Sequence, residues 1–176
     1  MRNSTRPPSP RVVARSRWCS CGYQNLLNGS IPSVELPDGA GRVRVIAGSF
    51  GGRSGPARTF TPMDVWDVRL AQGGVGRFTA QDGHTLALVV LRGTVLVNGS
   101  EVAREGQLVH FDRSGTGVEI EANGDATVLW LAGEPIDEPV VGYGPFVMNT
   151  QAEIHQAIAD FNAGRFGRVP PVASMD

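Results

Sequence analysis

The three histidines of this chain, His84, His110 and His155, are the side chains best suited to acid–base or metal chemistry. Each one is isolated, because the sequence contains no H-x-H pair and no H-x-x-E-H cluster. His155 lies between Glu153 and Gln156 in a helix-like segment, so we expect it to be a solvated surface residue. His84 and His110 are the one pair that could share a metal ion, but two imidazoles without an aligned carboxylate make a weak site.

The carboxylates and serines give no stronger catalytic arrangement. Glu119 and Glu121 are two residues apart on a predicted strand, so their side chains lie on the same face and could act as a general acid–base pair. Turn residues on either side favour a solvent-facing strand instead. The serines do not occur in a G-x-S-x-G nucleophile elbow. We therefore predict no catalytic residue in this chain.

The basic residues and the cysteines exclude other function classes. All 16 basic residues are arginine, so chemistry through a lysine Schiff base is excluded. Cys19 and Cys21 form a C-x-C pair, whereas zinc sites usually use C-x₂₋₄-C with a second ligand pair. We interpret them as incidental thiols, and two cysteines provide no disulfide framework.

Residues 1–22 differ in composition from the rest of the chain. They contain five arginines, three prolines and no acidic residue, which predicts a disordered basic leader. The alternative is an arm that binds nucleic acid or another anionic surface, but the prolines favour a non-specific leader. We find neither a secretion signal nor the ~20 apolar residues of a membrane helix, and we expect a cytoplasmic protein.

Short strand patterns recur between residues 42 and 132 and predict an all-β sandwich or barrel. In the segment 64–70, Trp66 alternates with Asp67 and Arg69, which predicts one buried and one solvated face. The run Thr85–Leu91 is apolar throughout, so we expect a strand that is buried on both faces. The glycine-rich segment 49–56 is predicted to be a surface loop, and Asn98-Gly99 a hairpin turn. The predicted strands are 42–48, 64–70, 77–80, 85–91, 94–97, 101–103, 107–111, 118–121 and 127–132.

A single helix is predicted at 150–164, followed by a tail at 165–176. Thr150 and Glu153 form a capping box, and Gly164 supplies the C-terminal stop. Four apolar side chains fall on one face of this helix, which should therefore lie against the outside of the barrel. They are Ile154, Ala157, Ile158 and Phe161.

Two stretches of the chain resemble the pirin family. The run GEPIDEPVVGYGPFVMNTQAEIHQAIADFNAGRFG, residues 133–167, resembles the closing segment of pirin-like proteins. The segment that begins at Tyr23-Gln24-Asn25 is similar to the start of their second cupin domain. The resemblance implies a cupin-type β-barrel over residues 23–149 with the C-terminal helix after it, and we expect that the first cupin domain is missing.

The resemblance further implies that, in the pirin family, the first barrel holds iron or a related metal through three histidines and one glutamate. When this chain is aligned on the cupin signature through Gly93, none of the ligand positions carries histidine or glutamate. With Gly106 as the anchor of the second motif, the ligand position is Val109, and His110 lies one residue further, on the opposite strand face. We therefore predict a degenerate cupin without a metal site. The positions tested in the first motif are Thr79, Ala80, Gln81, Asp82 and Leu86.

Roles known in the family include redox sensing, transcriptional co-regulation and quercetin 2,3-dioxygenase activity. Because the metal ligands are absent here, we expect a non-catalytic structural or interaction domain without a cofactor of its own. The alternative is one part of a quercetin 2,3-dioxygenase-like enzyme whose metal-binding half is supplied by another chain. An uncovered barrel face would favour a homodimer, or a partner that covers this face.

Overall fold

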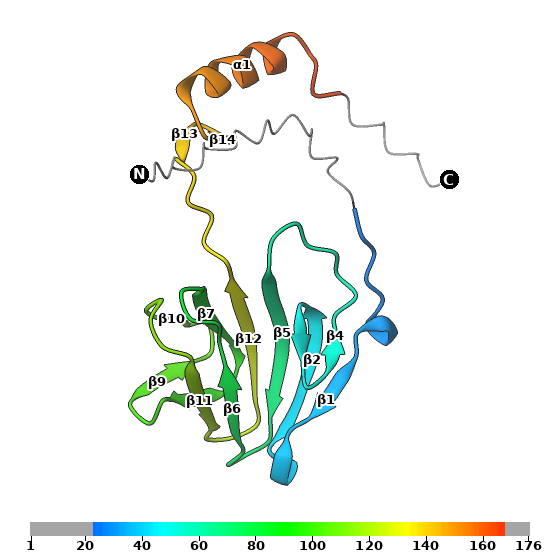
Figure 1. Ribbon diagram of the computed structural model, residues 1–176, viewed down its shortest axis with the longest axis vertical. Helices are drawn as coiled ribbons and strands as arrows, with labels where there is room; N and C mark the ends of the chain where they lie inside the picture. Colours follow the sequence, from blue (N-terminus) through cyan, green and yellow to red (C-terminus); the bar gives the residue numbers. More distant parts are fainter. Residues whose placement is uncertain (1–22, 168–176) are drawn as a thin grey trace, which may run out of the picture.

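A computed structural model describes residues 23–167 of the chain (Figure 1). The predictions for the leader 1–22, including Cys19 and Cys21, and for residues 168–176 of the tail lie outside this range. Within it, two antiparallel sheets enclose one hydrophobic core, in agreement with the predicted all-β barrel.

The larger sheet has six strands in the order β1-β2-β5-β12-β7-β10, and the smaller has four in the order β6-β11-β8-β9. Both are built from antiparallel pairs. The strands of the larger sheet are β1 (Ser33–Glu35), β2 (Gly41–Ala47), β5 (Met63–Leu70), β7 (Thr85–Arg92), β10 (Leu108–His110) and β12 (Ala126–Gly133). Those of the smaller are β6 (Val75–Thr79), β8 (Thr94–Val97), β9 (Glu101–Arg104) and β11 (Gly117–Ala122).

Turn chemistry accounts for the tight connections. Asn98 and Gly99 both have positive φ, as a hairpin between β8 and β9 requires, so this prediction is confirmed. The segment 49–56, predicted to be a loop, contains a short hairpin of β3 (Ser49–Phe50) and β4 (Arg53–Ser54). Gly51 and Gly52 supply the positive φ values of its turn.

The core lies between the two sheets and is aliphatic and aromatic. Trp66 and Trp130 stack with ring centroids 4.9 Å apart, and Phe78 lies 5.5 Å from Trp130. Phe50, from the short hairpin, closes the cluster 5.0 Å from Trp66. The alternation predicted for residues 64–70 is therefore correct for Trp66, which points into the core.

Strand β7 corrects one prediction, because it is buried on one face only. Leu86, Leu88 and Val90 point into the core, whereas Ala87 and Val89 point outward and are only half-buried. The uniformly apolar composition of residues 85–91 had predicted that both faces of this strand are buried. Among the described residues nothing covers the outer side, so the sheet presents an apolar face to solvent.

The C-terminal segment also departs from the prediction. Helix α1 (Gln151–Asn162) has the predicted capping box, with Glu153 N–H donating to Thr150 Oγ1 and Thr150 N–H donating to Glu153 Oε2. It packs on a second hairpin, β13 (Val141–Tyr143) and β14 (Phe146–Met148), and not on the barrel. Figure 1 shows this unit set apart from the barrel by the linker 134–140.

The reason lies in the linker and in what buries the helix face. Two prolines, Pro135 and Pro139, favour an extended backbone. Ile154 and Ala157 are buried in the hairpin–helix unit, so the β13–β14 hairpin covers this part of the apolar helix face. Phe161 remains 61% exposed. No helix in residues 23–167 is long and apolar enough to cross a membrane.

Candidate functional site

The mouth of the barrel is where a cupin would be expected to bind a ligand. A pocket of about 310 Å³ opens there, with His84, Gln81 and Asp112 at its polar rim. Leu86 and Phe111 contribute apolar surface. The rim is fixed by short contacts between loops, since Gly83 N–H donates to Arg113 O at 2.8 Å and Gly115 N–H donates to Asp82 Oδ1 at 3.0 Å.

The residues present at the mouth do not fit a metal ion. Ala80 and Leu86, at two of the aligned ligand positions, point into the core but offer no donor atom. The Asp82 carboxylate accepts the hydrogen bond from Gly115 N–H and so joins the two loops of the rim. No group of three or more His, Cys, Asp or Glu side chains converges anywhere in residues 23–167.

The two candidate histidines are not brought together. His84 lines the mouth pocket. His110 is exposed on β10 and pairs in register with Ala87, whose side chain points away from the core. Val109 packs against the core instead, as the one-residue shift in register predicts. His155 is exposed on α1, as predicted.

The interior behind the mouth is filled by the aromatic cluster. Trp66 and Trp130 are almost completely buried, and their Nε1–H groups have no hydrogen-bond partner among the described residues. Buried donors of this kind are uncommon. Because bulky rings occupy the space between the sheets, the barrel is a packed core rather than an open ligand cavity.

Neither acidic residue singled out on β11 forms a catalytic pair. Glu119 makes an ion pair with Arg77 on the neighbouring strand β6 at 2.9 Å. Glu121 is exposed on the same outer face of the smaller sheet. Both carboxylates therefore lie on a solvated strand surface.

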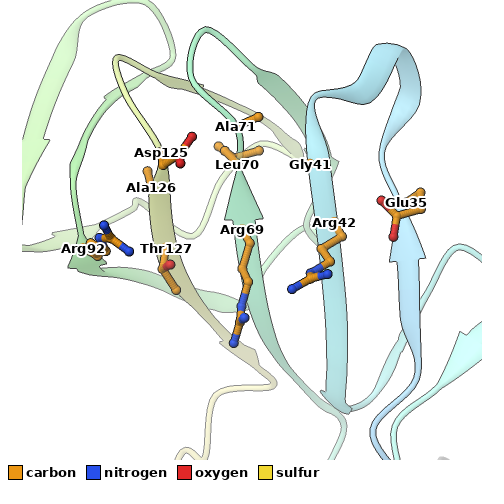
Figure 2. A pocket seen from close by; sticks show the side chains of 10 residues that line it. All are labelled: Glu35, Gly41, Arg42, Arg69, Leu70, Ala71, Arg92, Asp125, Ala126 and Thr127. Atoms are coloured by element: carbon orange, nitrogen blue, oxygen red, sulfur yellow. The ribbon is translucent and has the colours of Figure 1, made fainter.

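A second hollow, which we call the arginine groove, lies on the outer face of the larger sheet and has a volume of about 410 Å³. Arg42 on β2, Arg69 on β5 and Arg92 on β7 line it, with Thr127 of β12 between the last two (Figure 2). We refer to these three arginines as the arginine row. In Figure 2 their side chains follow one another across neighbouring strands.

Strand register accounts for the row. Arg42 pairs with Arg69, Arg69 pairs with Thr127, and Thr127 pairs with Arg92. A β-bulge at Leu91 is essential for the last pairing, because Val128 pairs with Val90 while Thr127 pairs with Arg92. Without the extra residue, strict alternation after Val90 would move Arg92 out of line with Thr127.

One buried carboxylate stands next to the row. Asp67 accepts hydrogen bonds from Arg69 and, across the strand pair, from Arg44 at 2.8 Å. Burial raises the pKa of the Asp67 carboxyl, but the hydrogen bonds and charges of Arg69 and Arg44 together outweigh this effect and lower the pKa below its ordinary value. Asp67 is therefore ionised at neutral pH and already shared by two arginines.

The alternation in residues 64–70 predicted a solvated face for Asp67 and Arg69. This is correct for Arg69, whose side chain is 43% exposed, but wrong for Asp67, which is buried beside Arg69 and Arg44. The groove was not predicted. The separate strands gave no information on which arginines would be neighbours. The alternation of arginine with valine in residues 42–45 was the one available signal. Arg92 lies at the last position of β7, just beyond the predicted strand 85–91.

Comparison with known proteins identifies the family. A profile of the Pirin C-terminal cupin domain matches residues 65–167. A Pseudomonas aeruginosa protein that is provisionally named quercetin 2,3-dioxygenase is 53% identical over 146 residues, covering 83% of this chain and 51% of that protein. Mouse pirin is 35% identical over 150 residues, covering 82% of this chain and 51% of mouse pirin.

A solved structure gives the same result for the fold. The crystal structure of quercetin 2,3-dioxygenase from Acinetobacter baumannii superposes with a TM-score of 0.79 at 41% identity, covering 83% of this chain and 51% of that one. The chain thus spans about half the length of the relatives that it matches. With a cupin fold and a matching domain profile over most of its described residues, this chain belongs to the pirin family.

Proposed function

We propose that this chain acts as a non-catalytic interaction domain of the pirin family. The observation that carries the proposal is the apolar outer face of the larger sheet. Six outward side chains from four neighbouring strands form this face, which we call the apolar face. They are Val65, Ala87, Val89, Leu108, Leu129 and Leu131.

The apolar face has the character of a protein contact rather than of an ordinary surface. Its residues are half-buried by their own neighbours, except for Leu108 on the edge strand β10, which is 60% exposed. Contiguous apolar surface of this kind marks interaction sites in soluble proteins. The absence of a metal-ligand cluster from residues 23–167 gives no support to catalysis by this part of the chain.

A second copy of the chain is the partner that we propose for this face. The strands of the face form a regular sheet surface, and two such surfaces can pack against each other about 10 Å apart. A twofold axis lets one contact cover the apolar face of both copies, as in most homodimers.

The variant Leu108→Glu tests this proposal, because it places a charge at the most exposed position of the apolar face. The expected result is a shift from dimer to monomer in analytical ultracentrifugation at tens of micromolar. The matched control is Val102→Glu on the edge strand β9 of the smaller sheet, where Val102 is 50% exposed. This control should leave the dimer intact. A wild-type chain that sediments as a monomer at this concentration would contradict the dimer.

The second candidate function is that of one part of a quercetin 2,3-dioxygenase-like enzyme. It is favoured by the relatives and the solved structure that carry this activity in their names, and by the fact that the chain spans about half of each. Residues 23–167 offer no set of metal ligands, and in this proposal the metal is bound by another chain.

Elemental analysis of the purified chain and an assay of quercetin loss after incubation with Fe(II) separate the two functions. For an interaction domain we expect substoichiometric metal and turnover equal to that of a control without protein. For the enzyme we expect turnover well above this control only when a metal-loaded N-terminal cupin domain of a pirin is added. Stoichiometric iron with turnover in this chain alone would contradict both proposed functions.

A further inference from the structure

We propose that the arginine groove is a binding site for a small oxyanion, which is a carboxylate or phosphate group of a metabolite-sized ligand. The site lies at the end of the larger sheet where β12 begins, beside the apolar face and separate from the mouth of the barrel. The inference is independent of the proposed function, since a domain with either role could bind such a ligand.

The first argument is that the arginine row brings like charges together. Arg42 and Arg69 are direct register partners, and the side chains of such partners start only ~5 Å apart. Like charges at this separation destabilise a sheet. The bulge at Leu91 then adds a third guanidinium to the same row. Of the three, only Arg69 is paired with a carboxylate of the described residues, so an anion could bind between guanidinium groups that still have free donors.

The second argument is that, in the part of the chain that the structure describes, the carboxylates at the groove leave two of its three arginines without an ion pair, although Glu35 and Asp125 also line it and reduce its net positive charge. Asp67 is shared between Arg69 and Arg44. Asp125 accepts a hydrogen bond from Gln72 N–H at 3.1 Å. Glu35 is the register partner of Arg42, yet within residues 23–167 neither Arg42 nor Arg92 forms an ion pair.

The chemistry of the lining indicates the class of ligand. Guanidinium groups present a planar fork of N–H donors that matches carboxylate and phosphate oxygens. The hydroxyl of Thr127, between Arg69 and Arg92, adds a neutral donor in the same row. Gly41, Leu70 and Ala126 complete a partly apolar wall. A volume of about 410 Å³ suits a small organic anion.

A titration followed by NMR of backbone amides tests the proposal. The full chain is titrated with sodium phosphate and, separately, with sodium succinate, while sodium chloride keeps the ionic strength constant. We expect saturable shifts at Gly41, Leu70 and Thr127, which line or flank the row. Because each charge-assisted hydrogen bond contributes substantially to affinity, Arg42→Gln and Arg92→Gln should each weaken binding about tenfold.

The matched control is Arg104→Gln, which removes one exposed strand arginine from β9 of the smaller sheet and should leave the affinity unchanged. Saturation by phosphate alone supports a phosphate ligand, and saturation by succinate alone supports a carboxylate. Shifts that stay linear with both anions, or that are equal in wild type and Arg42→Gln, would overturn the site. Because Leu108→Glu tests the apolar face and leaves the row intact, failure of the dimer and failure of the anion site are distinguishable.

Discussion

Trp66 and Trp130 are register partners on β5 and β12, and their rings stack inside the barrel at an interplanar angle of 14°. Phe78 and Phe50 contact the same pair from the smaller sheet and from the short β3–β4 hairpin. This cluster joins three separate parts of the chain. The stability of the barrel should therefore depend strongly on it, since buried aromatic rings contribute large contact areas.

Replacement of Trp130 by alanine tests this dependence. The side chain is fully buried, so its loss should lower the free energy of unfolding by about 3–5 kcal/mol. Urea denaturation measures the change, and the near-UV circular dichroism of the stacked pair should disappear. Phe60→Ala serves as the control, because Phe60 is 84% exposed and should change stability by less than about 0.5 kcal/mol. Equal losses in both variants would contradict a central role of the cluster.

Asp67 gives the fold a specific acid sensitivity. The arginines lower its pKa in the folded state, so its contribution to stability is fully present above its unfolded-state pKa and is lost as the pH falls through the folded-state pKa. We expect Asp67→Asn to cost about 2 kcal/mol at pH 7 and to flatten the decline in stability below about pH 4. Urea denaturation at a series of pH values measures both effects.

The control for this variant is Glu101→Gln, which removes an exposed carboxylate on β9 that forms no ion pair among the described residues. It should leave the acid limb of the stability profile as in wild type. If Asp67→Asn and wild type lose stability in parallel below pH 4, the buried carboxylate is not the source of the acid sensitivity.

Local patterns in the sequence were sufficient for much of the fold. Trp66 alternates with Asp67, and this period of two fixed the inward and outward faces of β5. Asn98-Gly99 predicted the β8–β9 turn because few residues accept its positive φ values. Thr150 and Glu153 predicted the start of α1 because the capping contacts are local. In each case the determining interactions lie within a few residues.

Features that depend on distant parts of the chain were not accessible in this way. The arginine row depends on the pairing of β2, β5, β12 and β7 and on the β-bulge at Leu91, which no local sequence motif predicted. The apolar stripe of α1 indicated that one helix face is buried, but not that β13 and β14 cover it. The same limit applies to β7, where composition could not show that its outer face is left uncovered.

The separation of α1 from the barrel leads to the last prediction. Thr150→Ala removes the side chain that accepts from Glu153 N–H at 3.2 Å, which should destabilise the helix terminus by about 1 kcal/mol. Because α1 packs on the β13–β14 hairpin, hydrogen exchange should accelerate at the amides of residues 151–162 but not in the barrel. Thr59→Ala, in the loop before β5, is the matched control and should leave exchange in α1 unchanged. A fall in the urea midpoint of the barrel with Thr150→Ala would show instead that the helix and the barrel unfold as one cooperative unit.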